Sequence, residues 1–371
     1  MALSKILTSS VADTVLQTNK NIIKNGAMVI AQRSTSVTGD TAGGSVKTVD
    51  RMNPEMNAAG TWTQSQSTDV PSGQGFVNSF KLDCTTADAS LAGNDYVAFG
   101  HRIEGLDLQR LNYGTSGAKN SVLSFWVKTN KAGNYVVGIQ NAITGGTSKN
   151  CSFLYTVSSA NTWQKIKFPV PADTAAAFDN DANATVYIYW WLAVGSNYKT
   201  GTLRTTWTNN VSADFAVGLN VNLADSTDNE WYITGIQWEE GDVATPFEHE
   251  DFGTTLHKCQ RYFAIRENTA SSSSQYYSLL QAYNTTQVFG YIADYPVYPM
   301  RAIPSVSQSG NFGAYKKDSG NANMATTIGN LGSTTQGWLT GGWGGGSGLV
   351  AGEASVMFAN AGAKLIADAE L

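Results

Sequence analysis

Residues 122–128 read VLSFWVK, and this stretch decides the predicted fold. Successive side chains of a β-strand point to opposite faces of a sheet. Leu123, Phe125 and Val127 therefore share one wholly apolar face, while the other face carries a mixture of polar and aromatic side chains. This alternation is typical of a half-buried strand.

The same aromatic, alternating pattern recurs at short intervals on both sides of this stretch. Eight further strands are predicted at residues 76–82, 96–103, 135–139, 151–155, 163–168, 186–191, 215–219 and 231–238. Many short strands joined by turns favour an all-β sandwich. We expect an antiparallel jelly roll of two sheets.

Turns and loops are predicted around this set of strands. Residues 21–26 read NIIKNG, which predicts a strand that runs into an Asn-Gly turn. Residues 34–46 are rich in Ser, Thr and Gly and are predicted to be a loop.

The sequence pattern predicts that the chain has three parts. Residues 1–20 are too short to fold alone and are interpreted as an attachment segment. Residues 21–250 form the jelly-roll domain, and residues 251–371 form a second, smaller β-rich tip domain. A short helix within residues 252–263 joins the two domains, because Leu256 and Cys259 recur there at helical spacing.

The second domain carries weaker signals. Short strands are predicted at residues 287–292 and 354–359, and a terminal strand at residues 363–371. Residues 341–348 read GGWGGGSG and are predicted to be a flexible surface loop.

Composition narrows the classes of partner. Charged residues make up 14% of the 371 residues and the formal net charge is −5, with no run of basic residues. Nucleic acids and anionic lipids need clustered Lys and Arg, so neither is expected as a partner. No apolar run is long enough to insert into a membrane. The three cysteines, Cys84, Cys151 and Cys259, are widely spaced and are expected to be buried free thiols.

Several stretches together resemble a known family. They are residues 21–33, 48–51, 101–105, 123–128, 162–163, 233–249 and 259–263. The strongest is 233–249, which reads ITGIQWEEGDVATPFEH. The chain resembles phage tail-fibre and other virion surface proteins built on a carbohydrate-binding-module-like jelly roll. Met52 stands where the family has Trp. The resemblance implies a jelly-roll domain of a phage particle, often in a homotrimeric fibre.

Enzyme activity is not expected. The serious enzymatic alternative is a tailspike that degrades glycans, which needs two carboxylates in one groove. Asp83 with Asp95, or Glu239 with Glu248, are the candidate pairs, and solvated or capping carboxylates are the simpler interpretation. The sequence contains neither an HExxH nor a GxSxG motif. No catalytic residue is therefore nominated.

Ligand-binding candidates come from the aromatic residues. Trp126, Trp163, Trp190 and Trp191 lie in strand patterns and are expected to pack in the core. Trp338 and Trp343 lie in a Gly-rich stretch where no strand pattern demands them, so they are the predicted ligand-binding residues, with packing or trimer contact as the alternative. Stacking of sugar rings on exposed aromatic side chains is the expected chemistry.

No cofactor and no catalytic metal is expected. A structural Ca²⁺ is considered, because carboxylate and amide oxygens are its preferred ligands. The candidates are Asp83, Asn94, Asp95 and Asp228.

The function expected from these observations is structural. The chain is predicted to be a tail fibre that adsorbs to a host surface glycan or receptor, made in the host cytoplasm and carried on the virion. Its partners are other copies in a homotrimer and other virion proteins, the latter through residues 1–20. The alternatives are a capsid-decorating, head-fibre or tail-adaptor protein and, less favoured, a depolymerase.

Overall fold

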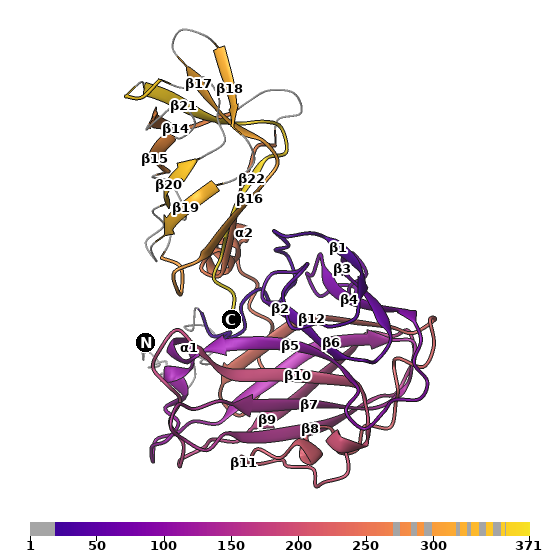
Figure 1. Ribbon diagram of the computed structural model, residues 1–371. Helices are drawn as coiled ribbons and strands as arrows, with labels where there is room; N and C mark the ends of the chain where they lie inside the picture. The colour runs from indigo at the N-terminus through magenta and orange to yellow at the C-terminus, as the bar shows by residue number, and fades with distance from the viewer. Residues whose placement is uncertain are drawn as a thin grey trace, which may run out of the picture. The chain divides into compact units, whose positions relative to one another are not determined.

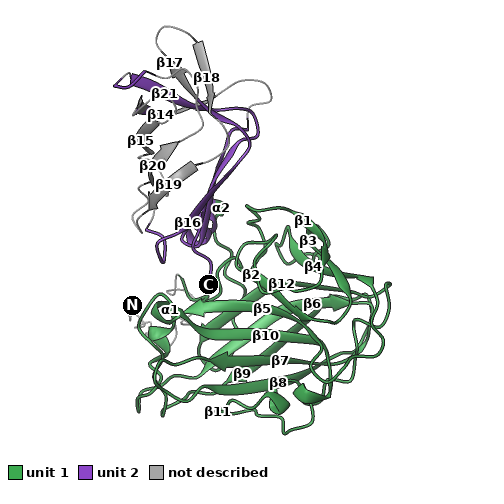
Figure 2. Ribbon diagram, viewed as in Figure 1, with its two compact units in different colours: residues 1–252 green, residues 253–371 purple. Residues whose placement is uncertain are grey.

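The computed structural model describes residues 19–269, 275–282, 288–292, 299–316, 320–324, 328–333, 339–343, 350–352 and 354–371. The chain divides into two compact units, Met1–Phe252 and Gly253–Leu371, shown in green and purple in Figure 2. The boundary predicted from the sequence, after Glu250, lies two residues before this division. Most of the predicted attachment segment, residues 1–18, lies outside the described residues.

Unit 1 is an antiparallel sandwich of two six-stranded sheets, which Figure 1 shows as stacked layers. In spatial order, sheet A consists of β1 (Ser36–Asp40), β3 (Thr61–Ser67), β4 (Ser79–Thr86), β12 (Glu230–Glu240), β6 (Ser121–Thr129) and β9 (Gln164–Val170). Sheet B consists of β11 (Thr208–Asn209), β8 (Lys149–Val157), β7 (Gly133–Asn141), β10 (Ala184–Val194), β5 (Tyr96–Glu104) and β2 (Met52–Asn57). The predicted jelly-roll class is confirmed.

Large aromatic side chains fill the space between the two sheets. Phe99 of β5 lies 5.4 Å from both Trp190 of β10 and Trp231 of β12, measured between ring centroids. Phe125 of β6 lies 5.6 Å from Trp190, which joins the two layers directly. Leu123, Phe125 and Val127 are fully buried, as the alternation at residues 122–128 predicted. Burial of this apolar area is the main favourable term for unit 1.

Most of the predicted strands of unit 1 are present, but 215–219 is not a strand. Residues Ser212–Asp214 form the 3-10 turn η5, and local bonds from Phe215 N to Ser212 O and from Leu219 N to Ala216 O continue the turn. Gly218 has a φ of +93°, which an extended strand does not accommodate.

The predicted strand at residues 21–26 is also wrong. Asn25 has a φ of +58°, and the chain turns there instead of extending. Two backbone bonds, Ile22 N to Trp238 O and Ile236 N to Gly26 O, attach the turn to β12. A Cβ on Gly26 would lie 2.1 Å from the Ile236 carbonyl oxygen, so only glycine fits this approach.

Four strands of unit 1 were missed, of which β11 is a two-residue edge strand. Strand β1 lies inside the predicted loop 34–46, and β2 and β3 lie in residues for which no strand was predicted. Strand β2 contains Pro54, which lowers strand propensity, yet it pairs in register with β5 at the edge of sheet B.

Unit 2 is also rich in β-structure. The helix α2 (Phe252–Gln260) confirms the helix predicted within 252–263. A three-stranded sheet consists of β13 (Phe263–Glu267), β22 (Lys364–Asp368) and β16 (Ser305–Ser309). A seven-stranded sheet consists of β18 (Gly320–Met324), β17 (Phe312–Lys316), β21 (Ala354–Ala359), β14 (Gln275–Ala282), β15 (Val288–Ile292), β20 (Leu339–Trp343) and β19 (Ile328–Ser333).

Several sequence predictions for unit 2 can be compared directly, and β15 lies within the predicted strand 287–292. Strand β21 matches the predicted strand 354–359, and β22 lies within the predicted terminal strand 363–371. The loop predicted at 341–348 is wrong for residues 341–343, which belong to β20 and pair with β15 and β19. No helix of the described residues is long and apolar enough to cross a membrane.

Candidate functional site: an aromatic face of sheet B

Three aromatic side chains of β10 line up on the outer face of sheet B. Tyr187, Tyr189 and Trp191 alternate with residues that point into the sandwich, such as the core residue Trp190. The ring centroids of Tyr187 and Tyr189 are 6.3 Å apart, and those of Tyr189 and Trp191 are 5.5 Å apart. The result is a row of rings along one strand, on the side away from the core.

The segment that follows β10 folds back over the end of this row. Tyr198, in the 3-10 turn η4 (Ser196–Tyr198), stacks on Trp191 with centroids 5.9 Å apart and an interplanar angle of 21°. Phe215 stacks on the same indole at 5.9 Å and 19°. Tyr96 contacts the Tyr198 ring edge-on, with the two ring centroids 5.4 Å apart. Trp191 is therefore 4% exposed, although it lies on the outward face of β10.

These side chains and their neighbours enclose a shallow hollow of about 280 Å³. It is lined by Glu55, Tyr96, Gln140, Tyr189, Trp191, Tyr198, Ser212 and Phe215. The lining combines aromatic rings with a few polar groups, which is the usual composition of a small-molecule site.

A charged pair flanks the aromatic row on the β5 and β2 side. Arg102 Nη2 lies 2.8 Å from Glu55 Oε1, and Asn53 Nδ2 donates to the same carboxylate oxygen at 2.8 Å. The guanidinium carbon of Arg102 is 5.8 Å from the centroid of Tyr187, within cation–π range. Donors and acceptors of hydrogen bonds therefore lie next to the rings.

Two glycines lie next to Tyr189 on the neighbouring strands and leave room for its ring. In the ladders of β10 with β5 and β7, Tyr189 lies opposite Gly100 on one side and Gly138 on the other. A Cβ on Gly100 would lie 2.7 Å from the Asn53 carbonyl oxygen and 3.4 Å from the Tyr189 ring. A Cβ on Gly138 would lie 3.2 Å from Trp191 Nε1. Larger residues at either position would displace the rings.

The electrostatic setting keeps the tyrosine hydroxyls protonated. Burial, followed by the negative charge of Glu55, raises the pKa of Tyr189 above its ordinary value. Burial and Glu55 raise the pKa of Tyr96 in the same way. Both hydroxyls are therefore available to donate hydrogen bonds at neutral pH.

The two ligand-binding residues predicted from the sequence are elsewhere. Trp338 lies outside the residues that the structure describes. Trp343 is the last residue of β20, so the expectation that no strand requires it is wrong. Their role in ligand binding stays a prediction.

The residues of the sheet B face were missed because four tryptophans were all assigned to the core. That assignment is right for Trp190 and Trp191, which are 0% and 4% exposed and belong to the buried core cluster, whereas Trp126 and Trp163 are only half-buried. The available signal was the sequence YIYWW at 187–191, whose alternation places Tyr187, Tyr189 and Trp191 on one face.

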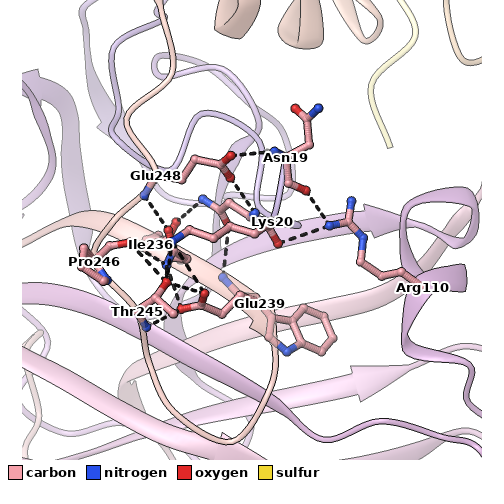
Figure 3. Close-up of polar contacts among 11 residues, drawn as sticks. Asn19, Lys20, Arg110, Ile236, Glu239, Thr245, Pro246 and Glu248 are labelled. Atoms are coloured by element: carbon pink, nitrogen blue, oxygen red, sulfur yellow. Dashed lines mark hydrogen bonds and ion pairs between the residues drawn. The ribbon is translucent and has the colours of Figure 1, made fainter. Parts of the chain in front are cut away.

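The motif 233–249, which carries the sequence resemblance, has a structural role in unit 1. Figure 3 shows the polar contacts that it makes with the segment that begins at Asn19. Glu248 accepts hydrogen bonds from Asn19 N at 2.6 Å and from Asn21 N at 2.8 Å. Asn21 Nδ2 donates to the Ile236 carbonyl oxygen at 3.0 Å. The two segments are thus joined side by side.

A buried carboxylate lies at the centre of this network. Glu239, which is 2% exposed, accepts hydrogen bonds from Gln237 Nε2 and Thr245 N, both at 2.8 Å. The Thr245 hydroxyl donates to Glu239 at 2.5 Å, and Lys20 Nζ donates to Thr245 Oγ1 at 2.5 Å and to the Pro246 carbonyl oxygen at 3.0 Å. The motif therefore fixes where the chain enters and leaves the sandwich.

The carboxylates considered for catalysis have other partners. Glu239 and Glu248 hold the network just described. Asp83 lies 3.2 Å from Lys81, and Asp95 accepts a hydrogen bond from Ala92 N at 2.7 Å. These are capping and pairing roles, as the simpler interpretation expected.

The candidate calcium ligands are partnered in a similar way. Asn94 Oδ1 accepts a hydrogen bond from Asn197 Nδ2 at 2.8 Å, and Asp83 and Asp95 have the partners given above. In the described part of the chain, no group of three or more His, Cys, Asp or Glu residues could hold a metal ion. Asp228 belongs to no such group.

No protein-family model and no curated protein matches the chain. Solved structures do match it. One is the enzymatically active domain of tailspike protein 4 of bacteriophage CBA120, with 13% identity, a TM-score of 0.31 and coverage of 60% of this chain. This chain spans 22% of the length of that tailspike chain.

Two carbohydrate-binding modules are further examples. The family 11 module of a Clostridium thermocellum cellulosomal cellulase has 14% identity and a TM-score of 0.26, covering 57% of this chain and 99% of that one. A xylan-binding domain from Paenibacillus barcinonensis has 12% identity and a TM-score of 0.28, covering 51% and 91%. These TM-scores are low, and the jelly-roll assignment rests on the strand order and register of sheets A and B.

Proposed function

We propose that unit 1 is a glycan-binding domain, and that the protein recognises a host surface glycan without cleaving it. One observation carries the proposal: the half-buried rings of Tyr187 and Tyr189 lie side by side on the outside of the sandwich, next to Trp191, which Tyr198 and Phe215 cover. Sugar rings present apolar C–H faces that pack on aromatic rings, while their hydroxyls need hydrogen-bond partners. The aromatic rings supply packing surface for the C–H faces, and Glu55 and Arg102 supply hydrogen-bond partners for the hydroxyls.

The shape of the face favours a chain of sugars over a single buried sugar. The rings are spaced by 5.5 and 6.3 Å along one strand, and the hollow at Trp191 is shallow. An extended oligosaccharide lying along β10 would contact both tyrosine rings at once. Each stacking contact contributes modestly, so affinity depends on the number of rings engaged.

The biological setting comes from the sequence. The resemblance of residues 233–249 and the other stretches to phage tail-fibre proteins supports a place on the virion surface. In that setting the protein is a homotrimeric fibre attached through residues 1–20, and three copies of a weak glycan site gain avidity. A capsid-decorating protein would use the same glycan-binding face.

Absence of catalysis is part of the proposal. The carboxylates considered for a depolymerase are held in networks that fix the chain, such as Glu239 with Thr245. Glu55 is paired with Arg102 beside the aromatic row. A carboxylate held by a cation is poorly suited to protonate a leaving group.

A glycan microarray probed with the full chain tests this function. We expect the wild type to bind a subset of oligosaccharides, and Tyr189→Ala to lose that binding. Trp163→Ala is the matched control, because Trp163 is a half-buried aromatic residue directly before β9 of the other sheet. A reducing-end assay on the bound glycans is expected to show no cleavage. Retained binding by Tyr189→Ala would contradict the assigned site, and released reducing ends would contradict the assigned function.

A further inference from the structure

A second hollow lies on the outer face of sheet A, the sheet that does not carry the aromatic row. It has a volume of about 470 Å³. It is lined by Gly73, Gln74, Phe76, Trp126, Lys165, Ala244, Thr245, Pro246, Phe247 and His249. The proposed glycan-binding face of sheet B includes none of these residues.

Three rings form one wall of this hollow. The Phe76 centroid lies 5.0 Å from that of Phe247 and 5.1 Å from that of His249. Gly235, at a bulge of β12 with a φ of +61°, lets Phe76 approach the sheet, since a Cβ there would lie 2.5 Å from the Phe76 ring. The wall is therefore held by the backbone beneath it.

An aromatic ring and a cation face the hollow from neighbouring strands. Trp126 of β6 lies directly opposite Lys165 of β9 in the antiparallel ladder. Trp126 is half-buried and Lys165 is exposed. Within the described part of the chain, neither side chain makes a hydrogen bond or an ion pair.

Two other lysines on this face of the sheet are paired with acids. Lys128 pairs with Asp69, and Lys81 lies 2.8 Å from Glu230. Lys165 has no such acid, and the hollow is lined by no Asp or Glu side chain. The hollow therefore combines apolar ring faces with an uncompensated positive charge.

We propose that this hollow binds a sugar residue that carries a carboxylate. Lys165 Nζ pairs with the carboxylate, because charge-assisted hydrogen bonds are the strongest polar contacts available there. The Trp126 ring packs on the apolar face of the sugar, and its indole N–H with the Gln74 amide serves the hydroxyls. The wall of Phe76, Phe247 and His249 limits the ligand to one or two sugar units.

This site is separate from the row on sheet B. The two lie on outward faces of different sheets, so one copy of the chain can hold two parts of a glycan or two glycans at once. Simultaneous engagement raises the overall affinity without any new contact. The inference does not rest on glycan binding by the sheet B face.

Isothermal titration of the full chain tests the proposal. The probes are glucuronic acid, N-acetylneuraminic acid and the methyl esters of both, which retain the ring and remove the charge. We expect at least one acid to bind. The dissociation constant of its methyl ester should be at least about tenfold higher. Binding of neither acid, or equal affinity for acid and ester, would overturn the proposal.

Variants locate the binding. Lys165→Gln is expected to weaken binding of the acid about tenfold. Lys167 lies on the same face of β9 but outside the hollow. Lys167→Gln is therefore expected to change the affinity for the acid by less than about threefold. Tyr189→Ala is expected to leave it unchanged. An unaffected Lys165→Gln, or a loss in Tyr189→Ala, would overturn the proposal, and the second result would assign the acid to the sheet B face.

Discussion

Tyr187 and Tyr189 lie side by side on the outer face of β10, with ring centroids 6.3 Å apart and an interplanar angle of 17°. Two nearly parallel rings on alternate residues of one strand give a half-buried aromatic surface on the outside of a sandwich. Such a surface costs solubility and is commonly a binding site.

The first prediction concerns the glycines next to Tyr189. Gly100→Ala should destabilise unit 1 by about 1–3 kcal/mol, because the added Cβ meets the Asn53 carbonyl oxygen at 2.7 Å and the backbone must shift. Urea unfolding measures this. Gly117→Ala is the control, since its Cβ meets only side-chain atoms of Asn112 and Thr115. Equal stability of wild type and Gly100→Ala would contradict the close packing at Gly100.

The second prediction concerns the network of the motif 233–249. Thr245→Val keeps the shape of the side chain but removes the hydroxyl that donates to Glu239 and accepts from Lys20. We expect a loss of about 1–3 kcal/mol, because buried Glu239 loses a partner. Thr200→Val, at an exposed turn, should change the free energy of unfolding by less than about 0.5 kcal/mol. If the two variants unfold alike, the network does not stabilise unit 1.

The third prediction is a pH dependence. Burial of Asp214 favours its neutral form, but hydrogen bonds from Arg204 Nε at 2.8 Å and Thr202 N at 2.7 Å outweigh it, and the pKa of Asp214 lies below its ordinary value of 3.8. A lowered carboxyl pKa contributes stability that is present above the unfolded value and is lost as pH falls through the folded value.

Urea unfolding at pH 5 and at lower pH checks this third prediction. The wild type should lose more stability than Asp214→Asn as the pH falls below about 4, since the variant has no carboxyl to titrate. The segment that holds Asp214 also carries Tyr198 and Phe215, so acid should loosen the wall at Trp191. Parallel pH profiles for the two proteins would argue against a stabilising role of the Asp214 charge.

The fourth prediction concerns the thiols. Cys84, Cys151 and Cys259 are free and buried, as predicted from the sequence. Burial, followed by the nearby Asp83, raises the pKa of Cys84 to about 11, and burial raises that of Cys151 well above its ordinary value. The native protein should react slowly with Ellman's reagent at pH 8, and three thiols should titrate in denaturant. Rapid reaction of one thiol in the native protein would place it at the surface.

The sandwich was predictable where alternation is strong. Strands β5, β6, β10 and β12 each pair a core-facing apolar set with an outward set, and the sequence shows this directly. Strands β2 and β3 were missed because they read MNPEMN and TWTQSQS, with a proline or with few apolar residues. Their pairing with β5 and β4 decides their conformation, and that information is not local.

The site was less predictable for a related reason. Alternation separates Trp190 from Trp191 onto opposite faces of β10, but does not say which face lies outside. Tyr198 and Phe215 reach Trp191 from turns, where no periodicity marks them. The residues on the other side of the row come from β2 and β5, far away in the sequence. Only the folded chain brings these groups together.

Calorimetric titration of Tyr187→Ala tests the central claim most directly. The ligand is the oligosaccharide that the wild type binds best on the microarray, and circular dichroism confirms that the variant is folded. Tyr187 is half-buried and lies outside the core, so the account predicts a folded protein whose affinity has fallen about tenfold or more. An unchanged affinity in the folded variant would contradict the claim that the aromatic row binds the glycan.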